Sequence, residues 1–241
     1  SYLCGQTTMP DENPNVLVWQ PNDAYTAWSW TSIDPNGTVH PAFFSNPFVG
    51  SIMNGVGNAG YVAADIIQRR NPTKTVRMYH CTYIAGTNET WLTGGVGHDA
   101  LSDATHGLAA AITAAGYTGD IDLVLASLGG NDSRETGGVP ARTGQEFYDD
   151  LRQLQIDTPE FTDAKYWYFT EIADPDVAPV QTDHYQPDWN GFTLLNANRR
   201  VHETILSSKD LPRVDGSHWE GEVFITHGEA IGHDYSDAPF A

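Results

Sequence analysis

Cysteine is scarce in this chain, which has Cys4 and Cys81 and no other cysteine among its 241 residues. A disulfide framework of the kind that stabilises small secreted domains is therefore excluded. Each cysteine lies in an apolar segment with no second Cys or His at a ligand spacing, so we expect no metal site. Two buried thiols on neighbouring strands are the favoured interpretation, and a disulfide between them in an oxidising compartment stays open.

Basic residues are also scarce, because 12 Lys and Arg stand against 31 Asp and Glu, which gives a formal charge of −19. Phosphate backbones and anionic membranes would be repelled, so we expect no nucleic-acid partner. No apolar run approaches the roughly 20 residues of a membrane helix, so we expect no membrane insertion. We interpret the excess of acidic residues as a means of keeping the protein soluble, including in salty surroundings.

The chain begins without an initiator Met and without the pattern of a signal or transit peptide. An apolar segment at residues 2–4 starts almost at once. We therefore expect a processed product or a piece of a longer protein, with further domains or subunits of a larger assembly as partners. An extracellular, cell-surface or virion-associated place is favoured over the cytoplasm.

Apolar runs rich in β-branched and aromatic residues alternate with helical patterns, which predicts an α/β fold with a mainly parallel sheet. No internal repeat or low-complexity linker is present, so one domain is predicted over residues 1–241. Strands are predicted at residues 2–4 and 75–84. Two more are predicted to start at Ile121 and at Tyr166, and the one at Ile121 is predicted to be a fully buried central strand. A long loop is predicted from residue 10 to about 55. Helices are predicted at about 57–70, 102–115 and 143–154. A last pair of helices is predicted on either side of a loop that contains Asp215 and His218.

Polar residues follow the predicted strands at Thr7, Gly86 and Asn131, and Asp215 and His218 follow the last crossover. Ligands of open parallel sheets bind beyond the carboxyl ends of the strands, so we expect these residues to converge. His218 would act as base for the Thr7 hydroxyl, with Asp215 fixing the imidazole tautomer. The Gly86 backbone N–H and the Asn131 side chain would stabilise a developing oxyanion, as acyl transfer requires.

Each of these residues alone has an ordinary structural explanation. The threonines at positions 7 and 8 are residues commonly found in turns, and Gly86 can be explained by a backbone angle that only glycine adopts easily. Asn131 and Asp132 fit a helix cap, and an Asp-x-x-His step occurs by chance. The order of all the segments, each after a predicted strand, is what favours ester hydrolysis.

This order resembles the SGNH, or GDSL-like, hydrolases, and most closely their branch of sialic-acid and carbohydrate O-acetylesterases. That branch begins with Gly-Gln-Ser-Asn-Met and has Gly-Gly-Thr/Ser-x-x-x-Trp after its second strand. Its later blocks are Gly-x-Asn-Asp and Asp-x-x-His, the latter continuing as Phe-x-x-Glu-Gly. The similar segments here are GQTTM at 5–9, AGTNETW at 85–91, GGND at 129–132 and DGSHWEGE at 215–222. The resemblance covers residues 3 to about 232.

The resemblance implies a three-layer α/β/α sandwich with a mainly parallel, flavodoxin-like sheet. It implies hydrolysis of acetyl esters on sugars, with no metal and no organic cofactor. By position, Thr7 is the nucleophile, His218 the base and Asp215 its partner. The backbone N–H groups of Thr7 and Gly86 and the side chain of Asn131 form the oxyanion hole. The expected partner is an acetylated glycan or another small ester, contacted by Gln6, Trp91 and Trp219.

The chain departs from the family at the nucleophile, because Thr7 replaces the usual serine and Thr8 the usual asparagine. The extra methyl group restricts χ1 and crowds the path of attack, although threonine serves as a nucleophile in some enzymes. Three interpretations follow: a slow or specialised esterase, a nucleophile inactivated by engineering, and a natural fold that has lost catalysis. The rival hypothesis is a silent module that binds a glycan or has a structural place in an assembly. Its sugar-stacking residues would be Trp28, Trp30, Trp91 and Trp219.

Overall fold

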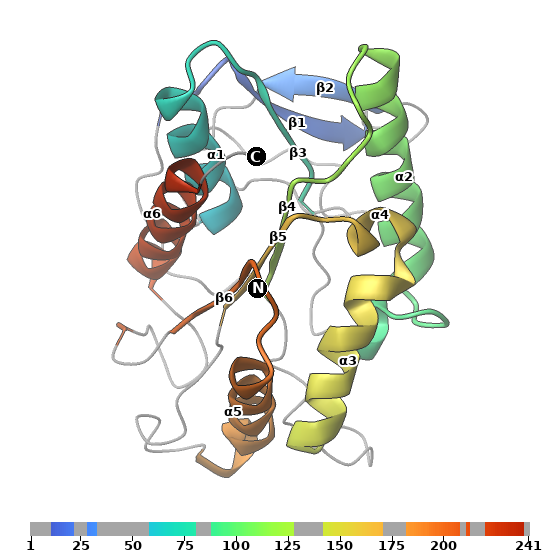
Figure 1. Cartoon of the computed structure of the whole chain (residues 1–241), viewed down its shortest axis with the longest axis vertical. Helices are drawn as coiled ribbons and strands as arrows, with labels where there is room; N and C mark the ends of the chain where they lie inside the picture. Colours follow the sequence, from blue (N-terminus) through green and yellow to red (C-terminus); the bar gives the residue numbers. More distant parts are fainter. Residues whose placement is uncertain are drawn as a thin grey trace. The chain divides into compact units, whose positions relative to one another are not determined.

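The computed structural model describes residues 11–21, 28–32, 58–80, 88–127, 142–170, 182–207, 211–212 and 220–238. The chain divides into two compact units, Ser1–Ile84 with Pro212–Ala241, and Ala85–Leu211. Figure 1 labels the helices and strands in chain order. The single domain predicted over residues 1–241 stays a prediction.

The first unit contains a three-stranded sheet in the order β2-β1-β3. In this sheet β1 (Val16–Pro21) pairs antiparallel with β2 (Trp28–Ser32) and parallel with β3 (Val76–Met78). The strand predicted at residues 75–84 is confirmed at β3 over a shorter length, since residues 79 and 80 follow it outside the strand.

The prediction of a loop over residues 10–55 is wrong at β1 and β2. Along β1, Val16 and Val18 are buried whereas Leu17 and Trp19 are partly exposed. This period of two is that of a strand with one face on a core. The many turn-forming residues around these short strands obscured the alternation in the sequence.

The first long helix, α1 (Ala59–Arg70), confirms the helix predicted at residues 57–70. The Asn58 side chain caps it by accepting a hydrogen bond from the backbone N of Tyr61 at 2.9 Å. The helix ends before Pro72, because the residue that precedes a proline is pushed out of the helical conformation.

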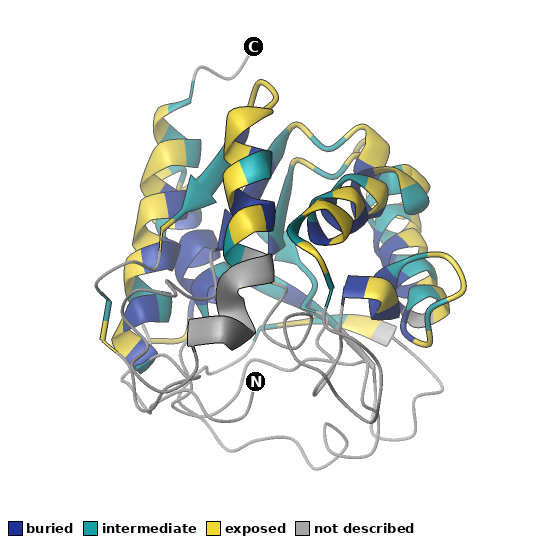
Figure 2. Cartoon of the chain, turned by 90° about the horizontal axis from the view of Figure 1, so that it is seen from below, coloured by how far each residue is buried: buried dark blue, intermediate teal, exposed yellow. Residues whose placement is uncertain are grey.

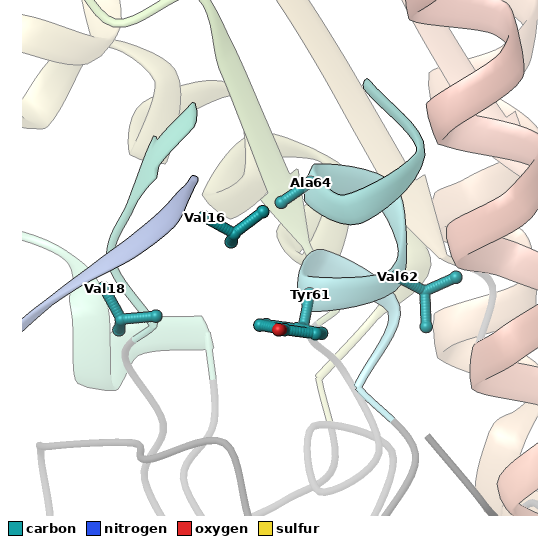
Figure 3. Close-up of a cluster of buried hydrophobic side chains, with 5 residues drawn as sticks. All are labelled: Val16, Val18, Tyr61, Val62 and Ala64. Carbon is teal, nitrogen blue, oxygen red and sulfur yellow. The ribbon is translucent and has the colours of Figure 1, made fainter. Parts of the chain in front are cut away.

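A cluster of buried side chains joins α1 to β1 (Figure 3). Its members are Val16, Val18, Tyr61, Val62 and Ala64. Tyr61 and Ala64 face β1, and Val62 lies on the side of α1 that faces α6 (Gly221–Asp237). A fully buried apolar side chain stabilises a fold by about 1.5–3 kcal/mol, so this cluster holds the first unit together.

The contact between α6 and α1 is close at two glycines. A Cβ on Gly228 would lie 2.5 Å from the Cβ of Val62. A Cβ on Gly232 would lie 2.8 Å from the Cβ of Ile66. Both distances are far below van der Waals contact, so a larger residue would push the helices apart.

Polar side chains are buried just before β1. The side chain of Asn13 donates to Asp65 Oδ1 at 2.7 Å and to Gln68 Oε1 at 3.1 Å. Its backbone N donates to the Tyr61 hydroxyl at 3.1 Å, and Arg69 Nε donates to both oxygens of Asp65. Burial raises the pKa of the Tyr61 hydroxyl. These bonds replace those that the buried groups would make with water.

The second unit contains an all-parallel sheet of β4 (Leu123–Ala126), β5 (Tyr166–Thr170) and β6 (Glu203–Leu206), in that order. Ala126 lies opposite Phe169, and Phe169 lies opposite Ile205. The three strands therefore end at one edge, which we call the carboxyl edge, and begin at the other, the amino edge.

Two predictions for this sheet are corrected. The strand β6 was not predicted, because four residues are too few to show a periodicity. The prediction of a fully buried strand from Ile121 is wrong, because Leu123, Val124 and Leu125 are half-buried. Among the described strands of this sheet, β5 rather than β4 lies in the middle.

The helices of the second unit alternate with its strands. They are the short 3-10 helix η2 (Asn88–Trp91), α2 (His98–Ala114), α3 (Gly144–Asp157), α4 (Pro159–Thr162) and α5 (Thr182–Ala197). The helices predicted at 102–115 and 143–154 are confirmed as α2 and α3. However, α2 begins one turn earlier than predicted, at His98, and its N-cap residue Gly97 makes no side-chain hydrogen bond.

The start of α3 is fixed by a capping box. The Thr143 side chain accepts from the Glu146 backbone N at 3.2 Å, and the Thr143 backbone N donates to Glu146 Oε2 at 2.7 Å. The apolar side of α3 packs on α5, where the rings of Phe147 and Phe192 meet edge to face with centroids 5.1 Å apart. A Cβ on Gly191 would lie 2.2 Å from Phe147 Cδ1, so this contact requires glycine.

The described residues form a mixed α/β protein with one all-parallel sheet, which confirms the predicted α/β class. Figure 2 shows buried residues along one side of the helices and exposed residues along the other, as expected for helices that cover a core. None of the described helices combines the length and the apolar composition needed to cross a bilayer.

Candidate functional site

Most of the predicted site residues lie outside the described residues. These are Thr7, Gly86, Asn131, Asp215 and His218, with Gln6 and Trp219 of the expected substrate contacts, and the two cysteines. Trp91 is described. The catalytic, oxyanion-hole and substrate-binding assignments therefore stay predictions, while the elements on either side of them can be examined.

Described helices or strands precede or follow three of the four predicted segments in the chain. The segment of Gly86 follows β3 and precedes η2, and the segment of Asn131 follows β4 and precedes α3. The segment of His218 directly precedes α6. Because β4 and β5 are parallel, the chain leaves β4 at the carboxyl edge and α3 returns it to the amino edge. The segment of Asn131 thus starts from the edge at which parallel sheets bind ligands.

The carboxyl edge carries two hydroxyl groups on neighbouring strands. Oγ1 of Thr170, the last residue of β5, donates to Oγ of Ser127, which follows β4, at 2.8 Å. Thr170 is buried and Ser127 is exposed. Since Ser127 Oγ accepts this bond, its own O–H can donate to a ligand. Sequence reasoning missed this pair, although a hydroxyl residue at the end of an apolar strand was a visible signal.

Trp91 lies in η2 with 6% of its surface exposed. A Cβ on Gly97 would lie 3.0 Å from Trp91 Cζ3, and a Cβ on Gly95 would lie 1.9 Å from the Glu89 carbonyl oxygen. The turn that follows η2 therefore folds tightly over it, and Gly95 leaves no space for a side chain. Burial makes Trp91 an anchor of this turn, and its contact with a substrate stays a prediction.

Arg142 connects η2 to α3 by two ion pairs. Its Nη1 donates to Glu89 Oε1 at 2.6 Å and its Nη2 donates to Asp150 Oδ2 at 2.5 Å. The Asp150 side chain is 10% exposed and that of Glu89 is 60% exposed. Burial raises the pKa of Asp150, and the positive charge of Arg142 offsets part of that shift. Burial also works against the charge on Arg142, but the two carboxylates outweigh it and raise the pKa of Arg142, so the guanidinium stays charged.

A second contact attaches the same turn to α3. The backbone N of Thr93 donates to Asp157 Oδ2 at 2.6 Å, and Gln153 Nε2 donates to Asp157 Oδ1. Burial would raise the pKa of Asp157, but these hydrogen bonds lower it. The segment after Gly86 is thus held by α3 at two carboxylates.

His80 follows β3 in the first unit, and its tautomer can be derived. The Asn58 carbonyl Oδ1 is occupied by the backbone N of Tyr61, so Asn58 Nδ2 is the atom that faces His80 Nδ1, at 2.9 Å. An amide nitrogen donates, so Nδ1 accepts and the proton of the neutral ring sits on Nε2. Removal from water lowers the pKa of His80 to about 4, so the ring is neutral at physiological pH.

A buried carboxylate lies at the amino edge of the second unit. Glu203, the first residue of β6, accepts hydrogen bonds from Arg152 Nη1 and from Gln155 Nε2, the latter at 2.8 Å. The backbone N of Arg200 donates to its other oxygen at 2.7 Å. Burial would raise the pKa of Glu203, but these bonds lower it. Protein groups fill the acceptor positions, which is typical of a structural ion pair.

No metal centre emerges from the part of the chain that the structure describes, where no group of three or more His, Cys, Asp or Glu side chains could hold an ion. His106 on α2 is largely exposed and lies with Nδ1 2.9 Å from Glu160 Oε1. His227 is buried in α6. Neither of these two histidines is adjacent in the chain to a predicted catalytic segment.

No protein-family model matches the chain, and no curated protein matches it. Among solved structures, the chain is similar to a protein from Arabidopsis thaliana, with a TM-score of 0.65 and 14% identity over 95% of this chain and 84% of that one. It is also similar to Est24, a carbohydrate acetylesterase from Sinorhizobium meliloti, with a TM-score of 0.41 and 16% identity over 74% of this chain and 84% of that one. The second score is too low to support an argument. The chain therefore shares its fold with the Arabidopsis protein, and this likeness concerns the fold alone.

Proposed function

We propose that the chain is an ester hydrolase of the carbohydrate O-acetylesterase type, with Thr7 in the place of the usual serine. The observation that carries the proposal is the order of four segments, at residues 5–9, 85–91, 129–132 and 215–218. One such segment arises easily by chance, but four in this order supply every group that one mechanism needs. The order of the elements supports the proposal, since β3 precedes the second segment in the chain and β4 precedes the third.

The fold that belongs to this function is a three-layer α/β/α sandwich with a flavodoxin-like sheet. The parallel order β4-β5-β6 and the helices α3 and α5 between successive strands support it. In such a sheet the reacting groups gather beyond the carboxyl ends of the strands. The hydroxyl pair of Ser127 and Thr170 lies at that edge and is suited to a substrate rich in hydroxyl groups.

In the proposed reaction Thr7 Oγ1 attacks the carbonyl carbon of the acetyl group while His218 accepts the hydroxyl proton. Asp215 orients the imidazole and stabilises its charged form. The oxyanion accepts hydrogen bonds from the N–H of Thr7, the N–H of Gly86 and the side chain of Asn131. One such donor contributes about 2.7–4 kcal/mol in a known acyl-transfer enzyme. His218 then protonates the leaving sugar oxygen, and a water that it activates releases acetate and restores Thr7.

The proposed substrate is an acetylated glycan or another small ester, with Gln6, Trp91 and Trp219 in contact with it. The reaction as proposed uses no metal and no organic cofactor, because the protein groups supply nucleophile, base and oxyanion donors. We place the protein outside the cell, on a surface or in a virion, as a domain or subunit of a larger assembly.

A second candidate is a catalytically silent module that binds a glycan or has a structural role. The threonines at positions 7 and 8 favour it, because the methyl group of Thr7 interferes with the approach to the ester. A displacement of the attacking oxygen by 1 Å can cost about a hundredfold in rate. Retention of Asp215, His218 and Asn131 in their segments favours the esterase over this alternative.

The deciding experiment measures acetate release from an acetylated aryl ester and from an O-acetylated glycan. The proteins compared are the wild type, Thr7→Ser and His218→Ala. We expect Thr7→Ser to equal or exceed the wild type, because serine removes the obstructing methyl group, and His218→Ala to lose activity. Equal turnover by the wild type and His218→Ala would contradict the mechanism. If none of the three proteins releases acetate, the binding or structural module is favoured.

A further inference from the structure

One charged cluster includes a residue of the segment that carries the predicted oxyanion donor Gly86. Glu89 follows Gly86 closely in the chain, and Arg142 is the first described residue after Asn131. Arg142 binds Glu89 at 2.6 Å and Asp150 of α3 at 2.5 Å. The 3-10 helix η2, which follows Gly86 in the chain, is therefore attached to α3 through a single guanidinium group.

Both carboxylates of this cluster are held by rigid surroundings. Asp150 lies inside α3, whose first turn is fixed by the capping box of Thr143. Glu89 lies in η2, which is anchored by the buried Trp91 and enclosed by the turn at Gly95. A planar guanidinium that binds two fixed carboxylates sets both distance and direction, which a lysine ammonium group does not.

The attachment of η2 to α3 has a second point at Asp157, which accepts from the backbone N of Thr93 at 2.6 Å. Asp150 and Asp157 are about two helical turns apart on α3. Arg142 supplies the attachment nearer to Gly86 in the chain, and Asp157 supplies the more distant one. Loss of Arg142 would therefore release the end of the turn that leads to the predicted donor.

We propose that Arg142 is a positioning residue of the candidate esterase site, which sets the separation between the segment after Gly86 and the start of α3. The inference rests on the proposed function, because Arg142 acts through the position of the predicted Gly86 donor and not through the substrate. The oxyanion exists in the transition state and not in the bound ester. A change in donor position therefore lowers kcat and leaves KM nearly unchanged.

The test measures kcat and KM for an acetylated aryl ester in Arg142→Gln, Arg142→Lys and Glu89→Gln. The same changes are made in the Thr7→Ser protein, which supplies activity if the wild type is slow. Arg142→Gln should lower kcat about ten- to a hundredfold and change KM less than about twofold. Arg142→Lys should recover part of this loss, because an ammonium group binds one of the carboxylates. Glu89→Gln should lower kcat less than Arg142→Gln, because the pair with Asp150 remains.

Lys165→Gln is the matched control. Lys165 Nζ binds Asp122 Oδ1 at 2.6 Å in the same unit, just before β5 and β4 at the amino edge. Lys165→Gln also removes one ion pair, but this pair lies at the opposite end of the strands from the carboxyl edge. We therefore expect kcat and KM to stay unchanged. The proposal is overturned if Arg142→Gln keeps the kcat of its parent, or if Lys165→Gln loses as much.

Hydrogen exchange distinguishes failure of this inference from failure of the proposed function. In Arg142→Gln the amides of residues 88–97 should exchange faster than in the wild type, and those of β6 should not. If neither the wild type nor Thr7→Ser releases acetate, the esterase proposal fails. Faster exchange in residues 88–97 would then still support the attachment through Arg142, and unchanged exchange would overturn it.

Discussion

The two ends of the parallel strands carry different kinds of polar group. Where strands begin, buried side chains satisfy one another, as Asn13 with Asp65 before β1 and Glu203 with Arg152 at the start of β6. Where strands end, some polar groups can still donate a further hydrogen bond. Within the described residues these are the Nε2–H of His80 after β3 and the O–H of Ser127 after β4.

This difference separates stability from ligand binding within one fold. A buried carboxylate without partners costs several kcal/mol, so the strand starts are sensitive to any deletion of a partner. An exposed hydroxyl such as that of Ser127 costs little to leave with water, so the end of β4 can keep a donor ready for a ligand. Substitutions at the two ends should therefore differ in size and in the property that they change.

The largest loss of stability is expected at the amino edge, in Arg152→Ala. Glu203 would remain with 3% of its side chain exposed and without its counter-ion. The contact of the guanidinium with the Tyr148 ring, at 5.3 Å, would be lost as well. Breaking a buried ion pair in this way costs about 3–5 kcal/mol, which urea denaturation would measure as a lower midpoint.

Lys165→Ala is the control for this change, because it removes an ion pair whose partners are 60% and 52% exposed. Exposed pairs contribute about 0–1 kcal/mol, so its midpoint should stay close to that of the wild type. A loss below about 1 kcal/mol in Arg152→Ala would contradict the assignment of the amino edge as the stabilising end.

The helices α1, α2 and α3 were predictable from the sequence because their signals are local. Asn58 and Pro72 mark the two ends of α1, and Thr143 with Glu146 marks the start of α3. The short strands were harder, since β6 has four residues and β1 lies among turn-forming residues. A strand of that length is stabilised by pairing with distant segments, which a single sequence does not display.

In the candidate site, too, features with a local sequence pattern could be predicted and contacts between distant residues could not. The segments at residues 5–9, 85–91, 129–132 and 215–218 could be assigned roles because each has its own residue pattern. Arg142 has no such pattern, because its partner Glu89 lies 53 residues away in the chain. The pair of Thr170 and Ser127 spans 43 residues and depends on the register of β4 and β5.

The next largest effect is expected at the end of β3, as a dependence of stability on pH. His80 has a pKa of about 4 in the folded chain against an ordinary value of 6.5. Between these values the unfolded chain binds a proton that the folded chain does not. The free energy of unfolding should therefore fall with pH from about 6.5 to about 4, by up to about 1.4 kcal/mol per unit.

His80→Gln tests this origin, because glutamine can accept from Asn58 Nδ2 without titrating. Urea denaturation at pH 7, 6 and 5 should show a slope in the wild type and a smaller one in His80→Gln. His106→Gln, which removes a histidine that is 80% exposed, should keep the slope of the wild type. The ion pair of Glu203 acts in a different window, because its lowered pKa loses stability only as pH falls below the ordinary value of 4.5. A slope that survives in His80→Gln would assign the pH dependence to another group.

The smallest effect is expected at the carboxyl edge, in Thr170→Val. Valine keeps the branched shape and removes the hydroxyl that donates to Ser127 at 2.8 Å. Ser127 is exposed and can bind water instead, so the loss should be about 0.5–1.5 kcal/mol, well below that of Arg152→Ala. Urea denaturation of the two variants side by side gives the comparison directly. If Thr170→Val lost as much as Arg152→Ala, the hydroxyl pair would be a stabilising contact and the carboxyl edge would not differ from the amino edge.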